Sequence, residues 1–141
     1  KNDEYFALTY GDGVSNIDIK KQIKFHKKHK KIATMSLVQP PGRFGAVKFK
    51  GKVIEKFIEK PQGDGAWVNG GFFILSPKIS EYIKGLNPIW EQEPLKKLSK
   101  KKQVNGYFHK GFWCAMDTLR DQIYLDDLWS KSKAPWKIWN D

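Results

Sequence analysis

The sequence predicts an α/β fold with a mixed, mainly parallel sheet and flanking helices. Three observations predict this class. Two short apolar runs enclose a segment of helical periodicity, which is the pattern of a strand–helix–strand unit. A pair of alternating segments later in the chain predicts a β-hairpin. The 141 residues are 40% hydrophobic and 29% charged, which is enough for one domain with one core.

The first unit covers residues 5–38. The apolar run at 5–9 predicts a buried strand that stops at a glycine turn, Tyr10-Gly11-Asp12-Gly13. Ser15 and Asp18 have the spacing of a capping box and predict a helix over 16–30. A second buried strand is expected at 32–38, so the two strands should run parallel. The helix carries many lysines, and we expect its solvated face to include His26 and His29.

The later elements follow from turn residues and periodicity. Residues 44–49 and 53–59 alternate around Lys50-Gly51-Lys52 and form the predicted hairpin. Further strands are predicted at 68–75, 103–108 and 111–115, and helices at 77–83, 93–101 and 118–129. Residues 130–141 form a tail rich in tryptophan, which we expect to pack on another surface.

The composition limits the classes of partner. The net charge is +11, but only Arg43 and Arg120 among the 26 basic residues are arginine, whereas specific readers of nucleic acid favour arginine. A specific nucleic-acid function is therefore not expected, although weak binding to polyanions is expected.

No apolar stretch of the sequence approaches the ~20 residues of a membrane span. The one cysteine, Cys114, excludes a disulfide framework and is expected to be an inert, partly buried thiol, which fits the reducing cytoplasm.

Two carboxylates follow predicted strands. Asp12 stands between glycines after the first strand, where ligands bind in open α/β sheets, and could hold Mg²⁺ beside a phosphate. The alternative is an ordinary turn aspartate. Asp117 precedes the helix at 118–129 and could simply cap it. If the two side chains converge, they would form a split Mg²⁺ site.

Other candidates lie at strand ends. Lys60, between Glu59 and Pro61, can present a point charge to a phosphate. Asn69, followed by Gly70 and Gly71, allows close approach of a ligand, but a tight turn explains the same residues. The three histidines have no spacing typical of metal ligands.

Taken together, the segments resemble the sugar-1-phosphate nucleotidylyltransferase family, and within it the members that use CTP and glucose 1-phosphate. The resemblance covers nearly the whole chain, and the matching segments follow one another in the same order as in the family. The segments that carry it are Leu8-Thr9-Tyr10-Gly11-Asp12-Gly13-Val14-Ser15, Gln39-Pro40-Pro41-Gly42-Arg43-Phe44-Gly45-Ala46, Glu59-Lys60-Pro61-Gln62-Gly63-Asp64-Gly65, Val68-Asn69-Gly70-Gly71-Phe72-Phe73, Met116-Asp117-Thr118-Leu119-Arg120-Asp121 and Ala134-Pro135-Trp136-Lys137.

The resemblance implies a Rossmann-like nucleotidyltransferase fold and Mg²⁺ dependence. The implied reaction is CTP plus glucose 1-phosphate to CDP-glucose and pyrophosphate, in a cytoplasmic homo-oligomer that supplies sugar nucleotides for lipopolysaccharide O-antigen. The implied catalytic residues are Asp12, Asp117 and Lys60, with the two aspartates as metal ligands. The residues implied to bind substrate are Tyr10, Gly11, Gly45, Glu59, Asn69 and Gly70.

The sequence also departs from the family's pattern. The glycine-rich, arginine-containing loop that opens these enzymes has no match in the 141 residues. We therefore expect the chain to be the C-terminal part of a single domain and to be inactive alone. The preference for cytosine rests on similarity, so a nucleotidyltransferase for another base stays open. A further alternative is a non-catalytic basic α/β module that binds polyanions or a protein through its lysine-rich helix.

Overall fold

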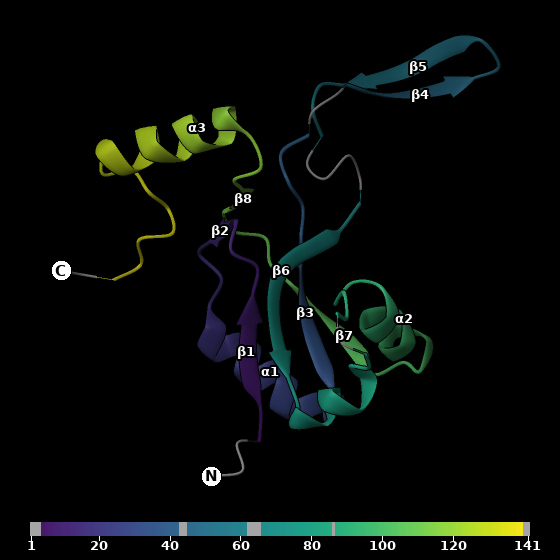
Figure 1. Ribbon diagram of the computed structural model, residues 1–141. Coiled ribbons are helices and arrows are strands. Elements are labelled where there is room, and N and C mark those ends of the chain that lie inside the picture. The colour runs from purple at the N-terminus through teal and green to yellow at the C-terminus, as the bar shows by residue number, and fades with distance from the viewer. Residues whose placement is uncertain (1–3, 43–44, 62–65, 86, 140–141) are drawn as a thin grey trace.

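The computed structural model describes residues 4–42, 45–61, 66–85 and 87–139. Arg43, Phe44 and the glycine-rich loop at 62–65 lie outside the described residues. At the centre is a four-stranded sheet in the order β1-β6-β3-β7 (Figure 1), formed by β1 (Phe6–Thr9), β6 (Val68–Leu75), β3 (Ala33–Val38) and β7 (Val104–Phe108). The core beneath it is formed by Ala33, Phe73, Leu75, Ile79 and Leu98.

The predicted mixed sheet is confirmed, and its strand order explains one difference. Strands β1, β3 and β7 run in one direction, but β6 inserts antiparallel between β1 and β3. The two strands of the predicted strand–helix–strand unit, β1 and β3, are thus parallel but do not pair with each other. The longer β6 lies between them and forms hydrogen bonds to both. As the edge strand of this sheet, β1 is largely exposed rather than buried as predicted.

The remaining elements match the predicted positions closely. Helices α1 (Ile19–His29), α2 (Glu93–Lys100) and α3 (Leu119–Ser130) are all present. The segment Pro77–Tyr82 is a 3₁₀-helix instead of an α-helix, with Ser76 as its cap. Two small antiparallel sheets complete the fold: β2 (Gly13–Ser15) pairs with β8 (Trp113–Ala115), and β4 (Ala46–Lys50) pairs with β5 (Val53–Ile58). None of the helices in the described part of the chain is long and apolar enough to cross a bilayer.

Helix α1 packs on the sheet through polar side chains. Gln22 is buried and donates a hydrogen bond from Nε2 to Ser36 Oγ at 2.8 Å. His26 is also buried, with Nδ1 2.9 Å from Thr34 Oγ1, so its predicted surface position is wrong. The half-buried His29 places Nε2 2.7 Å from the same hydroxyl. Hydrophobic periodicity could not reveal this buried face because its side chains are polar and form hydrogen bonds to β3.

The two histidines should make stability depend on pH. Burial is the main cause that lowers the pKa of His26 and of His29 below 6.5, and the charge of His29 lowers that of His26 further. The unfolded chain therefore binds more protons below about pH 6.5, and the free energy of unfolding should fall as the pH decreases. Urea denaturation between about pH 7.5 and pH 5, above most carboxylate pKa values, measures this. The His26→Gln/His29→Gln variant should show a shallower slope, and an equal slope in both proteins would contradict the interpretation.

Candidate functional site

The candidate site lies at one edge of the four-stranded sheet. Thr9 at the end of β1 pairs with Phe72, and Val38 at the end of β3 pairs with Val68. Since β1, β3 and β7 are parallel, their carboxyl ends meet at the edge where β6 begins (Figure 1). Ligands bind at this type of edge in open α/β sheets.

The structure brings the segments of Asp12 and Asp117 together. Pairing of β2 with β8 places Gly13 opposite Ala115, and the Met116 amide donates to the Asp12 carbonyl oxygen at 2.8 Å. Asp117 follows directly, so the two carboxylates, both exposed, start from neighbouring positions of adjacent strands. Helix α3 does not need Asp117 as its cap, because Thr118 and Asp121 form a capping box there.

Tyr10 and Asn69 form the wall beside Asp12. The Tyr10 amide donates to the Gly71 carbonyl oxygen at 2.9 Å and continues the pairing of β1 with β6. Asn69 Nδ2 donates to the Tyr10 hydroxyl at 3.0 Å, and Asn69 Oδ1 accepts from the Gly71 amide at 2.9 Å. These bonds fix the amide plane of Asn69 and leave one Nδ2 proton for a ligand.

Two glycines permit this packing. Gly71 has φ of +77°, and a Cβ there would lie 2.9 Å from the Tyr10 ring. A Cβ on Gly70 would lie 2.8 Å from Val38. Trp113 Nε1 donates to the Gly70 carbonyl oxygen at 2.8 Å and thereby fastens the small β2–β8 sheet to β6. The close approach that the sequence predicted at Asn69-Gly70-Gly71 is thus made by side chains of the same chain, Tyr10 at Gly71 and Val38 at Gly70.

Glu91 is a site residue that the sequence did not single out. The pKa of Tyr10 is raised to about 12, first by burial and then by a hydrogen bond to Glu91. The Tyr10 ring packs against Phe73 with centroids 5.6 Å apart and planes tilted by 48°, and Phe73 meets Trp90 edge to face at 5.4 Å. This aromatic row places Glu91 beside the phenol. The Tyr10 phenol therefore stays protonated throughout the neutral range. The only hint in the sequence is the acidic segment just before α2.

A second group of candidates lies at the base of the β4–β5 hairpin. A Cβ on Gly42 would collide with the Pro61 carbonyl oxygen, so the chain entering the hairpin crosses the chain leaving it. A Cβ on Gly45 would collide with the Phe57 ring at 2.5 Å and would lie 3.5 Å from Glu59 Oε2, so Phe57 packs over this glycine beside the carboxylate. Gly42 is four residues from the end of β3, and consecutive Cα atoms are ~3.8 Å apart, so this base stays near the same sheet edge.

Lys60 adopts an unusual backbone conformation at this crossing. Its φ is +42°, a left-handed conformation that is rare for residues other than glycine and is often found at functional sites. Lys60 Nζ lies 3.6 Å from Glu59 Oε1, with 63% of each side chain exposed. An ion pair so exposed contributes little stability, so Lys60 can turn to another anion at small cost.

The donor set near Asp12 fits Mg²⁺ bound together with a substrate. Among the described residues, no group of three or more histidine, cysteine or acidic side chains could hold a metal. Mg²⁺ keeps several waters and typically takes one or two carboxylates plus substrate phosphates, which is what Asp12 and Asp117 offer. Cys114 nearby is half-buried, and burial raises its pKa, as expected of an unreactive thiol.

Comparison with known proteins places the chain in a family. A family model described as "Nucleotidyl transferase" matches residues 1–140. A glucose-1-phosphate cytidylyltransferase of Salmonella typhimurium is 52% identical over 139 residues, which cover 99% of this chain and 54% of that protein. A probable glucose-1-phosphate cytidylyltransferase of Bacillus subtilis is 38% identical and covers 97% of this chain. The chain thus spans about half the length of these relatives.

Solved structures agree on the fold. A putative glucose-1-phosphate thymidylyltransferase from Bacillus anthracis has a TM-score of 0.62 at 20% identity, over 98% of this chain and 56% of that one. The protein HddC from Yersinia pseudotuberculosis has a TM-score of 0.63 at 21% identity, over 90% of this chain and 56% of that one. The Rossmann-like nucleotidyltransferase fold is therefore confirmed, and the chain belongs to the nucleotidyl transferase family.

Proposed function

We propose that the protein containing this chain transfers the cytidylyl group of CTP to glucose 1-phosphate, giving CDP-glucose and pyrophosphate. The observation that carries this proposal is the pairing of β2 with β8, which brings Asp12 and Asp117 to adjacent strands at the sheet edge. Support for the substrates comes from the two relatives, named glucose-1-phosphate cytidylyltransferases. Because the chain spans 54% of their length, the activity belongs to the longer protein.

In this reaction an oxygen of the sugar phosphate attacks the α-phosphorus of CTP in line, and the bond to pyrophosphate breaks. Catalysis of such a transfer is mainly positioning and neutralisation of charge. Asp12 and Asp117 hold Mg²⁺, which would neutralise charge on the phosphate oxygens. Lys60 holds the phosphate of glucose 1-phosphate as a point charge.

The neighbouring residues bind and orient the sugar. The Glu59 carboxylate accepts hydrogen bonds from sugar hydroxyls, and Gly45 lies beside it under the Phe57 ring. The remaining Nδ2 proton of Asn69 is donated to a hydroxyl, and the open space around Gly11 allows the ring to approach, whereas Gly70, predicted for the same role, is buried against Val38. The protonated Tyr10 phenol holds Asn69 in place for this task, supported by the 3.0 Å bond between them.

Four further properties are proposed for the whole protein. Mg²⁺ is its cofactor, because two carboxylates and the substrate phosphates suit that ion. It acts in the cytoplasm, where CTP is available, and it supplies a sugar nucleotide for the O-antigen of lipopolysaccharide. It assembles as a homo-oligomer, which is supported by the exposed apolar side chains of α3 and the tail, among them Leu119 and Trp139.

Lys60→Ala tests the assignment of the sugar phosphate. In the full-length protein we expect KM for glucose 1-phosphate to rise far more than KM for CTP. Loss of a charged hydrogen bond costs on the order of 1.5–3 kcal/mol, which corresponds to roughly 10–150-fold. Steady-state assays of pyrophosphate release measure both constants, and an equal rise in both would overturn the role of Lys60.

The control reverses two lysines elsewhere. Lys24→Glu/Lys28→Glu changes exposed residues on α1 and should leave both constants unchanged. The same assay with UTP, dTTP, GTP and ATP tests the choice of base, and preference for one of these would replace CTP in the proposal. The polyanion-binding alternative predicts the opposite pattern, namely heparin binding that is lost with the α1 variant and kept with Lys60→Ala.

A further inference from the structure

Strand β6 is irregular beside the candidate site. Between Met35 and Leu37 the pairing of β3 with β6 shifts register, so that three residues of β6 lie opposite one residue of β3. These three residues, called the β6 bulge here, are Gly70, Gly71 and Phe72. A bulge disrupts the ladder of hydrogen bonds, and buried backbone groups released in this way need partners from elsewhere.

The three carbonyl oxygens of the β6 bulge accept hydrogen bonds from three different elements. The donors, in the order of the bulge, are Trp113 Nε1 of β8 at 2.8 Å, the Tyr10 amide after β1 at 2.9 Å and Gln22 Nε2 of α1 at 3.3 Å. Trp113 and Gln22 donate through their side chains. A substitution can therefore remove either of these two bonds and leave the backbone bond of Tyr10 in place.

The bond of Trp113 joins the two parts of the proposed site. The carbonyl that it reaches belongs to the residue after Asn69, which is proposed to bind the sugar. Trp113 itself begins β8, the strand that leads to Asp117. A Cβ on Gly13 would lie 3.8 Å from Trp113 Nε1 and 3.7 Å from the same carbonyl oxygen, so the bond runs directly beside the residue that follows Asp12.

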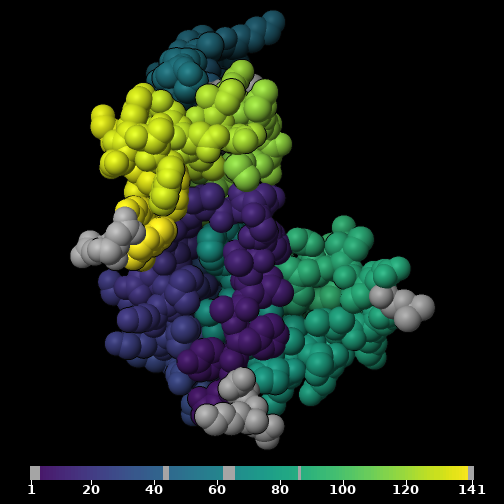
Figure 2. Space-filling model, turned by 60° about the vertical axis from the view of Figure 1, so that its left-hand side comes forward, coloured from purple at the N-terminus to yellow at the C-terminus, as the bar shows by residue number. Residues whose placement is uncertain are grey.

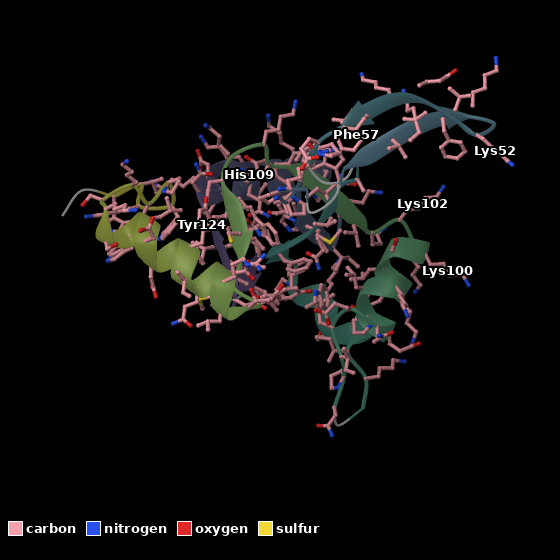
Figure 3. The ribbon with its side chains drawn as sticks, turned by 90° about the horizontal axis from the view of Figure 1, so that it is seen from above. Lys52, Phe57, Lys100, Lys102, His109 and Tyr124 are labelled. Atoms are coloured by element: carbon pink, nitrogen blue, oxygen red, sulfur yellow. The ribbon has the colours of Figure 1, made fainter. Side chains whose placement is uncertain are left out.

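The small β2–β8 sheet connects the large sheet with α3. Figure 2 shows the light-green and yellow segment around α3 on top of the purple segment that contains β1 and β2. In the view from above, His109 lies between Phe57 of the hairpin and Tyr124 of α3 (Figure 3). The His109 amide donates to a β3 carbonyl oxygen at 2.9 Å and holds the start of this segment, whereas Trp113 holds β8 itself. Asp117 comes after both, so its place relative to β6 depends on the bond of Trp113.

We propose that Trp113 is a positioning residue, whose indole N–H sets the spacing between the proposed metal carboxylates and the sugar-binding side chain of Asn69. This inference rests on the proposed function. In-line attack requires the sugar phosphate and the phosphates at the metal to be held in one geometry, and a displacement of ~1 Å can cost about a hundredfold in rate. Each part of the site still binds its own ligand when the link is lost. The rate should therefore suffer more than the binding of either substrate.

Two replacements of Trp113 in the full-length protein test this role. Trp113→Phe keeps an aromatic ring and removes the donor. Benzothienylalanine in place of Trp113 keeps the two-ring shape as well, with sulfur where the N–H was. Either replacement should lower kcat by roughly tenfold or more, while KM for CTP and KM for glucose 1-phosphate change by less than about threefold. Steady-state assays of pyrophosphate release measure all three constants.

Gln22→Met is the matched control. Gln22 is the other side-chain donor to the β6 bulge, but it belongs to α1 and does not lead to either carboxylate. Its replacement frees the Phe72 carbonyl and should leave kcat within about twofold of the wild-type value. Urea denaturation shows how far each variant is destabilised. An equal fall of kcat in Gln22→Met would overturn the proposal, because general loosening of β6 would then explain the rate.

Hydrogen exchange measures the same link without any substrate. The Met116 amide, which donates to the Asp12 carbonyl oxygen, lies between Trp113 and Asp117 in the chain. Its exchange should become roughly tenfold or more faster with benzothienylalanine in place of Trp113, and it should not change in Gln22→Met. Unchanged exchange in both variants would overturn the role of Trp113.

The kinetic and exchange results separate this proposal from the proposed function. If the wild-type protein releases no pyrophosphate from CTP and glucose 1-phosphate, the proposed function fails, and the exchange of the Met116 amide still decides whether Trp113 holds β8 in place. If KM for glucose 1-phosphate rises while kcat is kept, Trp113 acts in binding the sugar, and the positioning role is overturned. A kcat that both replacements of Trp113 leave unchanged would overturn it as well.

Discussion

Asp12→Asn and Asp117→Asn should each lower kcat of the full-length protein by roughly a hundredfold or more. Each substitution removes a negative oxygen donor while keeping the shape of the side chain, so the proposed site would offer the metal one carboxylate in place of two. Charge stabilisation in the transition state is usually the largest catalytic term, and loss of one such element costs about 10²–10³ in rate. Half-saturation should also require more Mg²⁺. Pyrophosphate release at varied Mg²⁺ measures both effects.

The control for this pair is Glu81→Gln. Glu81 is an exposed carboxylate in the 3₁₀-helix and lies outside the proposed site, so kcat should not change. If Asp117→Asn leaves turnover intact while Asp12→Asn does not, the shared metal site is wrong, and Asp12 acts without its neighbour.

The 141-residue chain alone should release no measurable pyrophosphate from CTP and glucose 1-phosphate. It spans 54% of the length of its relative from Salmonella typhimurium, and it lacks a match to the glycine-rich loop of the family. Correct placement of two reactants accounts for ~7–11 kcal/mol of a barrier. A chain that offers only the proposed sugar-phosphate and metal groups would lose this contribution.

The assay is run with the chain alone and with the complementary half supplied in trans. Recovery of turnover in the mixture would support the division of the site between the two halves. Turnover by the isolated chain would mean that the nucleotide site lies within these residues. The exposed edge strand β1 is the natural place for added strands to pair, because its free side is open to hydrogen bonding.

The part of the site that depends on local chemistry could be predicted from the sequence. An apolar run followed by Gly11-Asp12-Gly13 identifies a carboxylate just after a strand, and this needs no knowledge of the tertiary contacts. The contact between Asp12 and Met116 could not be derived in this way. It depends on β2, a strand of three residues that was not predicted, and on the pairing of β2 with β8, which lies within the strand predicted at 111–115. The register brings the two segments together, and convergence of the Asp12 and Asp117 carboxylates stays a prediction.

Tertiary contacts explain the predictions that failed. His26 was placed on the solvated face of α1 because lysines surround it in the sequence, yet its ring is buried against Thr34. Glu91 was overlooked because an aromatic row, Tyr10–Phe73–Trp90, brings it to the site from far along the chain. The register shift between Lys48 and Phe49 leaves Glu55 without a partner strand residue, so the sequence of β5 does not alternate strictly between faces near Lys56.

The central claim is that Asp12 and Asp117 hold one metal ion beside the substrate phosphates. The most direct measurement is a crystal structure of the full-length protein with Mn²⁺ and CDP-glucose, using anomalous scattering to locate the ion. The proposed site predicts one anomalous peak about 2.1 Å from an oxygen of each carboxylate and next to the diphosphate. A peak bound to only one of the two aspartates, or at another position of the chain, would contradict it.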